Sequence, residues 1–160
     1  MSGFSNPMQG MPEDIYETLW ASLCERVALG YFAVTEEVYE ELTHLTGSVG
    51  QCIADHKAEL VLELNAGDWD WPAYLAHYDA LYPKYEPFIA GTGGSKASLS
   101  VPDFSIVMLG KALALPVVSA EIPCAHQVGT KSRKIPDVCQ AENVQHMTFN
   151  DLLRAEGIKV

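Results

Sequence analysis

The sequence predicts a single α/β domain with a small parallel sheet, and three observations lead to this fold class. The chain has 160 residues, which is the size of one ordinary domain. Its 48% hydrophobic and 19% charged residues are typical of globular proteins. Along the chain, segments with helical periodicity alternate with short runs of β-branched residues. Such alternation is typical of helices packed on a parallel sheet.

The amino-terminal part is predicted to be helical. Residues 1–11 show no periodic pattern and are expected to be disordered or extended, so the domain would span residues 12–160. From Pro12 to Leu29, apolar residues recur at helical spacing, with a proline at the start and Gly30 after the end. These features predict the first long helix of the domain.

A β-prone run and three more helices are predicted next. Tyr31–Val34 has the composition of a short strand, and Thr35 can cap a helix over 36–44. Apolar spacing predicts further helices over 48–64 and 71–81. Two prolines are expected to end the last of these helices, because proline cannot donate a backbone hydrogen bond: Pro83 and Pro87.

The second half contains the clearest capping and strand signals. Ser100 and Asp103 have the spacing of a capping box, which predicts a helix that ends before Pro116. The β-branched run Val117–Ser119 resembles a buried parallel strand, and Asn143–Met147 is a second candidate strand. A short helix over 137–142 and a final helix capped by Thr148 and Asp151 complete the prediction.

Charge and hydropathy exclude several function classes. Ten Lys and Arg residues stand against 21 Asp and Glu residues, and the formal charge of −11 argues against passive attraction to nucleic acid or anionic lipid. The longest apolar run, residues 106–115, contains Lys111 and is shorter than the ~18 residues of a membrane span, so no membrane association is expected. Without a secretory signal the cytoplasm is the expected location, and the four cysteines are expected to be free, mostly buried thiols.

Acidic residues at the ends of predicted elements are the main candidates for chemistry. They are Glu41, Asp103 and Glu121, and each of them alone could be an ordinary surface carboxylate or helix cap. The basic cluster of the chain follows shortly after Glu121 and consists of Lys131, Arg133 and Lys134. Such a cluster is more often a solvated loop than a ligand site.

Two other kinds of site fit the sequence poorly. The segment 91–96 departs from the phosphate-loop pattern at Ser95, and the residue after Lys96 is not Ser or Thr. Four residues could be drawn as zinc ligands, but they lack the paired spacing of zinc knuckles: Cys124, His126, Cys139 and His146.

Several blocks of the chain, taken together, resemble one family of PIN-like proteins, designated DUF4411. The resemblance covers Pro12 to the carboxyl terminus, and its most specific part is KIPDVC followed by LLR. In order, the matching blocks are Val38–Leu42, Asp103–Ile106, Val117–Glu121, Lys134–Cys139 and Leu152–Arg154.

The resemblance implies a three-layer α/β/α domain and a metal-dependent ribonuclease that acts as the toxin of a toxin–antitoxin pair. It implies that Glu41, Asp103 and Glu121 hold Mg²⁺ or Mn²⁺, with the Ser119 hydroxyl beside the last of them. Clustered carboxylates suit such ions, which activate a water molecule and neutralise charge on a phosphate. The RNA backbone would then meet the basic residues Lys131, Arg133 and Lys134.

One departure from the family pattern affects the expected function. The family opens with an apolar strand that ends in Asp, and residues 12–23 match the helix that follows this strand. The first strand and one metal-binding Asp are therefore expected to be missing, and the chain is expected to be inactive or nearly so. An uncovered strand edge would favour association, including a homodimer.

Two alternatives to an active ribonuclease stay open at this point. A degenerate PIN fold could bind a protein partner or RNA without cutting it, and the missing Asp favours this reading. A small α/β domain of unrelated role is the third reading, because the resemblance rests on short blocks.

Overall fold

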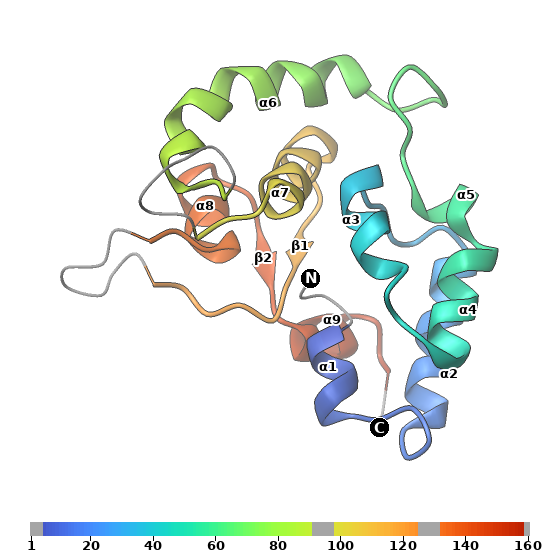
Figure 1. The fold of residues 1–160 in the computed structure, drawn as a ribbon. Coiled ribbons are helices and arrows are strands. Elements are labelled where there is room, and N and C mark those ends of the chain that lie inside the picture. The colour runs from blue at the N-terminus through green and yellow to red at the C-terminus, as the bar shows by residue number, and fades with distance from the viewer. Residues whose placement is uncertain (1–4, 91–97, 125–131, 159–160) are drawn as a thin grey trace.

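A computed structural model describes residues 5–90, 98–124 and 132–158 of the chain (Figure 1). In these residues helices predominate and two short strands pair. The elements are α1 (Ser5–Gly10), α2 (Glu17–Ala28), α3 (Glu36–Leu42), α4 (Gly47–Asp55), α5 (Lys57–Leu60), α6 (Trp71–Tyr85), the 3₁₀ turn η1 (Glu86–Phe88), α7 (Val101–Leu113), β1 (Val117–Val118), α8 (Ile135–Ala141), β2 (His146–Met147) and α9 (Phe149–Ala155).

The sheet confirms the α/β class. Strands β1 and β2 are parallel, with Val117 opposite His146 and Val118 opposite Met147. Within the described ranges the regular sheet has these two strands. Both strands lie where the sequence predicts them, although each is shorter than its β-prone run. The three-layer arrangement remains a proposal.

The predicted helix caps are present. The Thr35 hydroxyl oxygen accepts the backbone N–H of Val38 at the start of α3. At the start of α7, Ser100 Oγ accepts the N–H of Asp103, and Asp103 Oδ2 accepts the N–H of Ser100 at 2.8 Å. Thr148 and Asp151 form the same reciprocal pair at the start of α9. A cap uses residues within four positions of one another, which is why sequence spacing predicts it well.

Two amino-terminal predictions need correction. The segment 1–11, expected to be disordered or extended, contains helix α1, whose Pro7 is buried and whose Met8 packs against the first hydrophobic cluster. The run Tyr31–Val34, expected as a strand, makes a single parallel bridge between Val34 and Val61. No further strand pairing extends this bridge among the described residues.

Two helix predictions also need correction. The helix expected over 48–64 divides into α4 and α5 at His56, whose backbone leaves the helical region. Helix α6 continues through Pro83 to Tyr85. Proline removes one backbone hydrogen bond there, but Tyr82 and Tyr85 pack their rings against Phe104 of α7, and this tertiary contact favours continuing the helix.

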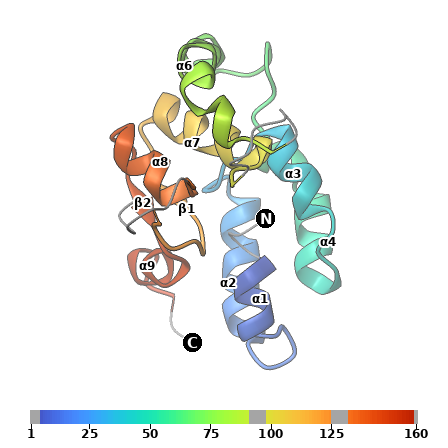
Figure 2. The ribbon, with the colours of Figure 1, turned by 60° about the vertical axis from the view of Figure 1, so that its left-hand side comes forward.

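The core consists of two hydrophobic clusters. The first is built mainly from α2, α3, α4 and α9, with Trp20 buried at its centre. The second lies around Phe104 of α7 and joins α6, α7, α8 and β1. Ile106 packs against both clusters. Figure 2 shows the same division, with α6, α7 and α8 on one side and α2 and α4 on the other.

Two further sequence expectations concern the cysteines and the membrane. All four cysteines are free, as expected, but Cys139 alone is fully buried and the other three are half-buried. In the described part of the chain, no helix is both long and apolar enough to cross a membrane.

Candidate functional site

An apolar cavity of about 380 Å³ lies where the two clusters meet. Its walls come from α3, α7, α8, α9, β1, β2 and the extended segment 31–34 before α3. The extended segment and β1 contribute Tyr31, Phe32, Ala33, Val34, Val117 and Val118. This size is within the usual range of ligand pockets, which are also mostly apolar with a few polar groups.

Two of the predicted metal ligands line this cavity. Glu41 reaches it from α3, and Asp103 reaches it from the first turn of α7. The starts of these two helices are tied together by a buried hydrogen bond of 2.8 Å between Thr35 Oγ1 and Ser105 Oγ. The fold therefore places on the wall of one cavity two carboxylates that are more than 60 residues apart in the sequence.

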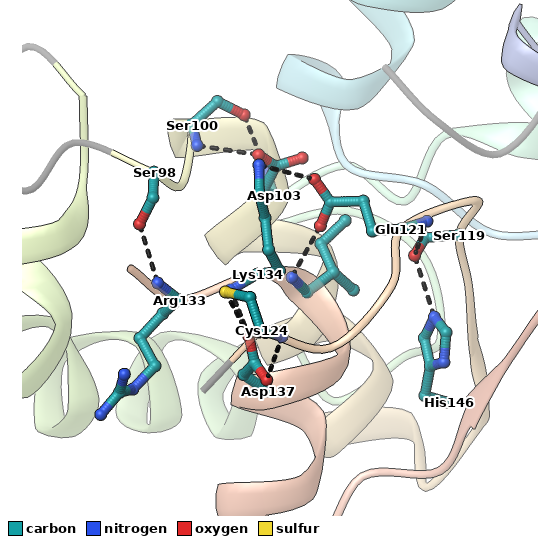
Figure 3. Close-up of polar contacts among 11 residues, drawn as sticks. Ser98, Ser100, Asp103, Ser119, Glu121, Cys124, Arg133, Lys134, Asp137 and His146 are labelled. Carbon is teal, nitrogen blue, oxygen red and sulfur yellow. Dashed lines mark hydrogen bonds and ion pairs between the residues drawn. The ribbon is translucent and has the colours of Figure 1, made fainter. Parts of the chain in front are cut away.

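The third predicted ligand, Glu121, is held by other partners. Its Oε2 accepts the backbone N–H of Ile135 at 2.8 Å, at the start of α8 (Figure 3). Its Oε1 lies 3.5 Å from the Lys134 ammonium. Glu121 is not among the residues that line the cavity. Its carboxylate stabilises the start of α8 in this conformation, because an anion there accepts a free amide and pairs with a cation.

The three carboxylates do not form a metal site in this conformation. Among the described residues, no group of three or more His, Cys, Asp or Glu side chains is placed to hold a metal ion. The physical reason lies in their partners: Asp103 caps α7, and Glu121 pairs with Lys134. Binding of Mg²⁺ or Mn²⁺ by Glu41, Asp103 and Glu121 therefore stays a prediction.

The Ser119 side chain is buried and makes hydrogen bonds within the protein. Its side chain is fully buried, and its Oγ lies 2.9 Å from His146 Nε2 of β2. The same oxygen accepts the backbone N–H of Glu121 at 3.3 Å. A hydroxyl without solvent exposure cannot contact a substrate unless the site opens. In this conformation the Ser119 hydroxyl stabilises the contact between the end of β1 and β2.

His146 is a residue whose role the sequence did not indicate. Burial lowers the pKa of its imidazole below the ordinary value of 6.5, and the negative charges of Glu121 and Asp151 oppose this shift. A neutral imidazole can accept a hydrogen bond from Ser119. The signal in the sequence was its place in the predicted strand 143–147, opposite the strand that contains Ser119.

Two residues of the basic cluster, Arg133 and Lys134, make contacts within the chain. The Arg133 guanidinium lies 5.1 Å from the ring centre of Phe88, and the Arg133 backbone N–H donates to Ser98 Oγ. The Lys134 ammonium pairs with Glu121 at 3.5 Å. Lys131 lies outside the described residues. Contact of the three with RNA stays a prediction.

Asp137, which lies in the KIPDVC block, is a second residue whose contacts the sequence did not indicate. Its side chain is 5% exposed and accepts the backbone N–H groups of Cys124 and Lys134 at 2.9 to 3.1 Å. It also accepts the Cys124 thiol at 3.2 Å. Burial and the Asp137 carboxylate raise the pKa of Cys124 above its ordinary value, so this thiol stays protonated at neutral pH.

The structure gives no support to the zinc site or to the phosphate loop that were considered from the sequence. His126 and the segment 91–96 lie outside the described residues. Burial raises the pKa of the Cys139 thiol to about 12, which opposes the thiolate form that zinc requires.

Comparison with known proteins supports the family. The model of the family described as "Domain of unknown function (DUF4411)" matches residues 8–160. No curated protein and no solved structure matches the chain.

Proposed function

The chain belongs to the DUF4411 family, and we propose that it is a binding module whose apolar cavity receives part of a partner protein. The observation that carries this proposal is the cavity of about 380 Å³ between the two hydrophobic clusters, with mostly apolar walls. An apolar recess left open to water is unfavourable by about 25 cal/mol for each Å² that a partner could bury. Such recesses are typical of binding sites.

The polar groups around the cavity fit binding better than hydrolysis in this conformation. Asp103 and Glu121 each hold the start of a helix through a backbone N–H. The Ser119 hydroxyl is buried against His146. Metal-assisted hydrolysis needs carboxylates that converge on one ion, and these side chains serve other contacts.

The first test measures whether the cavity binds apolar molecules. Nile red, an uncharged dye that fluoresces in apolar surroundings, should bind the full chain with a stoichiometry of one. Val38 lines the cavity, and Val38→Trp should abolish binding by filling the space. Ile122 is 79% exposed and does not line the cavity, so Ile122→Trp should leave binding unchanged. Equal binding by wild type and Val38→Trp would contradict the proposal.

A second candidate function is the PIN-type ribonuclease, acting in the cytoplasm as the toxin of a toxin–antitoxin pair within a three-layer α/β/α fold. The observation that favours it is that Glu41 and Asp103 line one cavity. For Glu121 to join them, its carboxylate would have to leave Lys134 and the N–H of Ile135. The residues therefore fit Mg²⁺ or Mn²⁺ only after a rearrangement.

Metal-dependent cleavage of single-stranded RNA by the 160-residue chain would favour the ribonuclease over the binding module. A ribonuclease requires cleavage that depends on Mn²⁺ or Mg²⁺ and is lost in Asp103→Asn. Asparagine keeps an oxygen that can accept the Ser100 N–H, so this variant retains the cap and loses the charge. The binding module predicts no cleavage above that of Asp103→Asn, and a melting temperature that millimolar Mn²⁺ does not raise.

A further inference from the structure

Helices α2 and α4 each carry one cysteine where the two helices meet. The helices lie side by side (Figure 1), and Leu23 of α2 and Ile53 of α4 are buried in the first hydrophobic cluster. Cys24 and Cys52 are their neighbours in the sequence, and both are half-buried. The pair therefore lies at the edge of this helix contact, where core packing fixes both helices and water still reaches the side chains.

The two cysteines contact one another. The Cys52 thiol donates to the backbone carbonyl oxygen of Cys24 at 3.7 Å, although the two positions are 28 apart in the sequence. The two thiols also interact directly, and burial together with this interaction raises the pKa of the Cys24 thiol to about 12. A disulfide needs close backbones, with Cα atoms about 4.4–6.8 Å apart. Contact of one thiol with the backbone of the other cysteine indicates such closeness.

A surface recess gives solvent access to this pair. Both cysteines line the recess, together with the acidic side chains of Glu25 and Asp55. No lysine or arginine is among the described residues that line it. Negative charge repels anionic reactants, so the recess favours a small uncharged reagent. Neither cysteine lines the apolar cavity, and the recess is therefore a separate site.

The other two cysteines have different surroundings. Cys139 is fully buried in the second hydrophobic cluster. The Cys124 thiol donates to the Asp137 carboxylate at 3.2 Å. Neither of them lines the recess. A bond formed within the folded chain is therefore expected between Cys24 and Cys52.

We propose that Cys24 and Cys52 form a reversible disulfide bond, by exchange with a small uncharged disulfide, and that this bond ties α2 to α4. The loop that it closes contains the extended segment 31–34 and α3, which line the apolar cavity. Cross-linking lowers the conformational entropy of the unfolded chain, so oxidation stabilises the fold. This modification site goes beyond the proposed binding function and does not depend on it.

The exchange takes two steps. First, Cys52 loses its proton to water and its sulfur attacks one sulfur of the reagent, whose S–S bond breaks and whose first half leaves and takes up a proton. Next, the Cys24 sulfur attacks Cys52 Sγ, and the second half of the reagent leaves with the proton that Cys24 loses. The two cysteines give up two electrons, which reduce the reagent. Cys24 attacks second because its raised pKa keeps it protonated at neutral pH.

The test exposes the full chain to hydroxyethyl disulfide, an uncharged reagent, and maps the products by mass spectrometry without reduction. We expect a chain that is lighter by about 2 Da, the two hydrogen atoms lost. Its cross-link should join the peptides that contain Cys24 and Cys52. The melting temperature should rise by about 5–10 °C over that of the reduced chain. Dithiothreitol should reverse both changes.

Three variants test the roles of the individual thiols. Cys24→Ser should keep one mercaptoethanol adduct on Cys52, because the second attack cannot occur. Cys52→Ser should form no cross-link and show no rise in melting temperature with the reagent. The matched control is Cys124→Ser, whose hydroxyl can still donate to Asp137, and this variant should form the cross-link as wild type does.

Three results would overturn the inference. A folded chain that stays reduced, while the chain unfolded in urea forms cross-links, would mean that the fold keeps the two sulfurs apart. A cross-link that includes Cys124 or Cys139, or that joins two chains, would place the reactive pair elsewhere. A lower melting temperature of the cross-linked chain would mean that the bond strains the two helices. The peptide map uses the wild-type chain, so it holds even if a variant fails to fold.

Discussion

His146 shows how burial affects the charge of a side chain. The Ser119 hydroxyl and His146 Nε2 are 2.9 Å apart, and the imidazole is half-buried between β1 and the start of α9. Burial disfavours the charged imidazolium more than the nearby Glu121 and Asp151 carboxylates favour it. The pKa of His146 is therefore lowered in the folded chain, and this shift links folding to pH.

We expect the free energy of unfolding to fall as the pH drops below the ordinary histidine pKa of 6.5. In that range the unfolded chain binds a proton at His146 and the folded chain does not, so acid favours unfolding until the folded pKa is reached. Urea unfolding at pH 5 to 8 measures this dependence. His146→Gln should reduce the slope.

The control for this measurement is the matched substitution His77→Gln in α6, which removes a histidine outside the sheet. A smaller slope that is specific to His146→Gln supports the effect of burial. An NMR titration that finds His146 at or above 6.5 would contradict the stated effect of burial.

At the scale of elements, the contact of α7 with β1 determines the position of the cavity. Gly110 lies in α7 beside Val117, and a Cβ atom built on it would be 2.5 Å from Val117 Cγ2 and 3.1 Å from the carbonyl oxygen of Leu115. Helix and strand can approach this closely because position 110 has no side chain. The helical conformation itself does not require glycine here, since its φ is not positive.

Gly110→Ala should lower the free energy of unfolding by about 1–3 kcal/mol, because an added methyl group in a filled contact forces the strand or the helix to move. The matched control is Gly10→Ala, where an added Cβ atom would meet no atom within 4 Å. We expect that variant to be neutral or slightly stabilising, because alanine favours a helix over glycine. If Gly110→Ala and wild type have the same free energy of unfolding in urea, β1 can move to admit the methyl group without loss of stability.

At the scale of the whole molecule, two hydrophobic clusters share few side chains. Ile106 packs against both, and it also lines the cavity between them. Leu81 of α6 packs against the second cluster and not the first. The substitutions Ile106→Ala and Leu81→Ala therefore test whether the two clusters unfold together or separately.

Ile106→Ala should speed hydrogen exchange at amides of both α2 and α7, with a loss of about 1–3 kcal/mol for a half-buried isoleucine. Leu81→Ala should speed exchange in α7 and leave α2 close to wild type. Measurement by mass spectrometry of peptides from each helix would show this. The same increase in both helices for both variants would mean that the clusters unfold as one unit.

The sequence by itself determined the features that depend on neighbours along the chain. Thr35, Ser100 and Thr148 each cap a helix at the predicted position, because the cap and the amide that it accepts are three residues apart. The strand at Val117 was also predicted, since it follows from a short β-branched segment. Family membership followed from blocks of the same kind.

Tertiary packing decided the rest. Whether Pro83 ends α6 depended on ring contacts with Phe104, and no local pattern contains that information. Three acidic residues at the ends of elements look alike in the sequence, yet Glu41 and Asp103 line a cavity while Glu121 pairs with Lys134. The cavity lies between segments that pair with other partners, since Val34 bridges Val61 and β1 pairs with β2. Pairing between distant segments arises only when the whole chain packs.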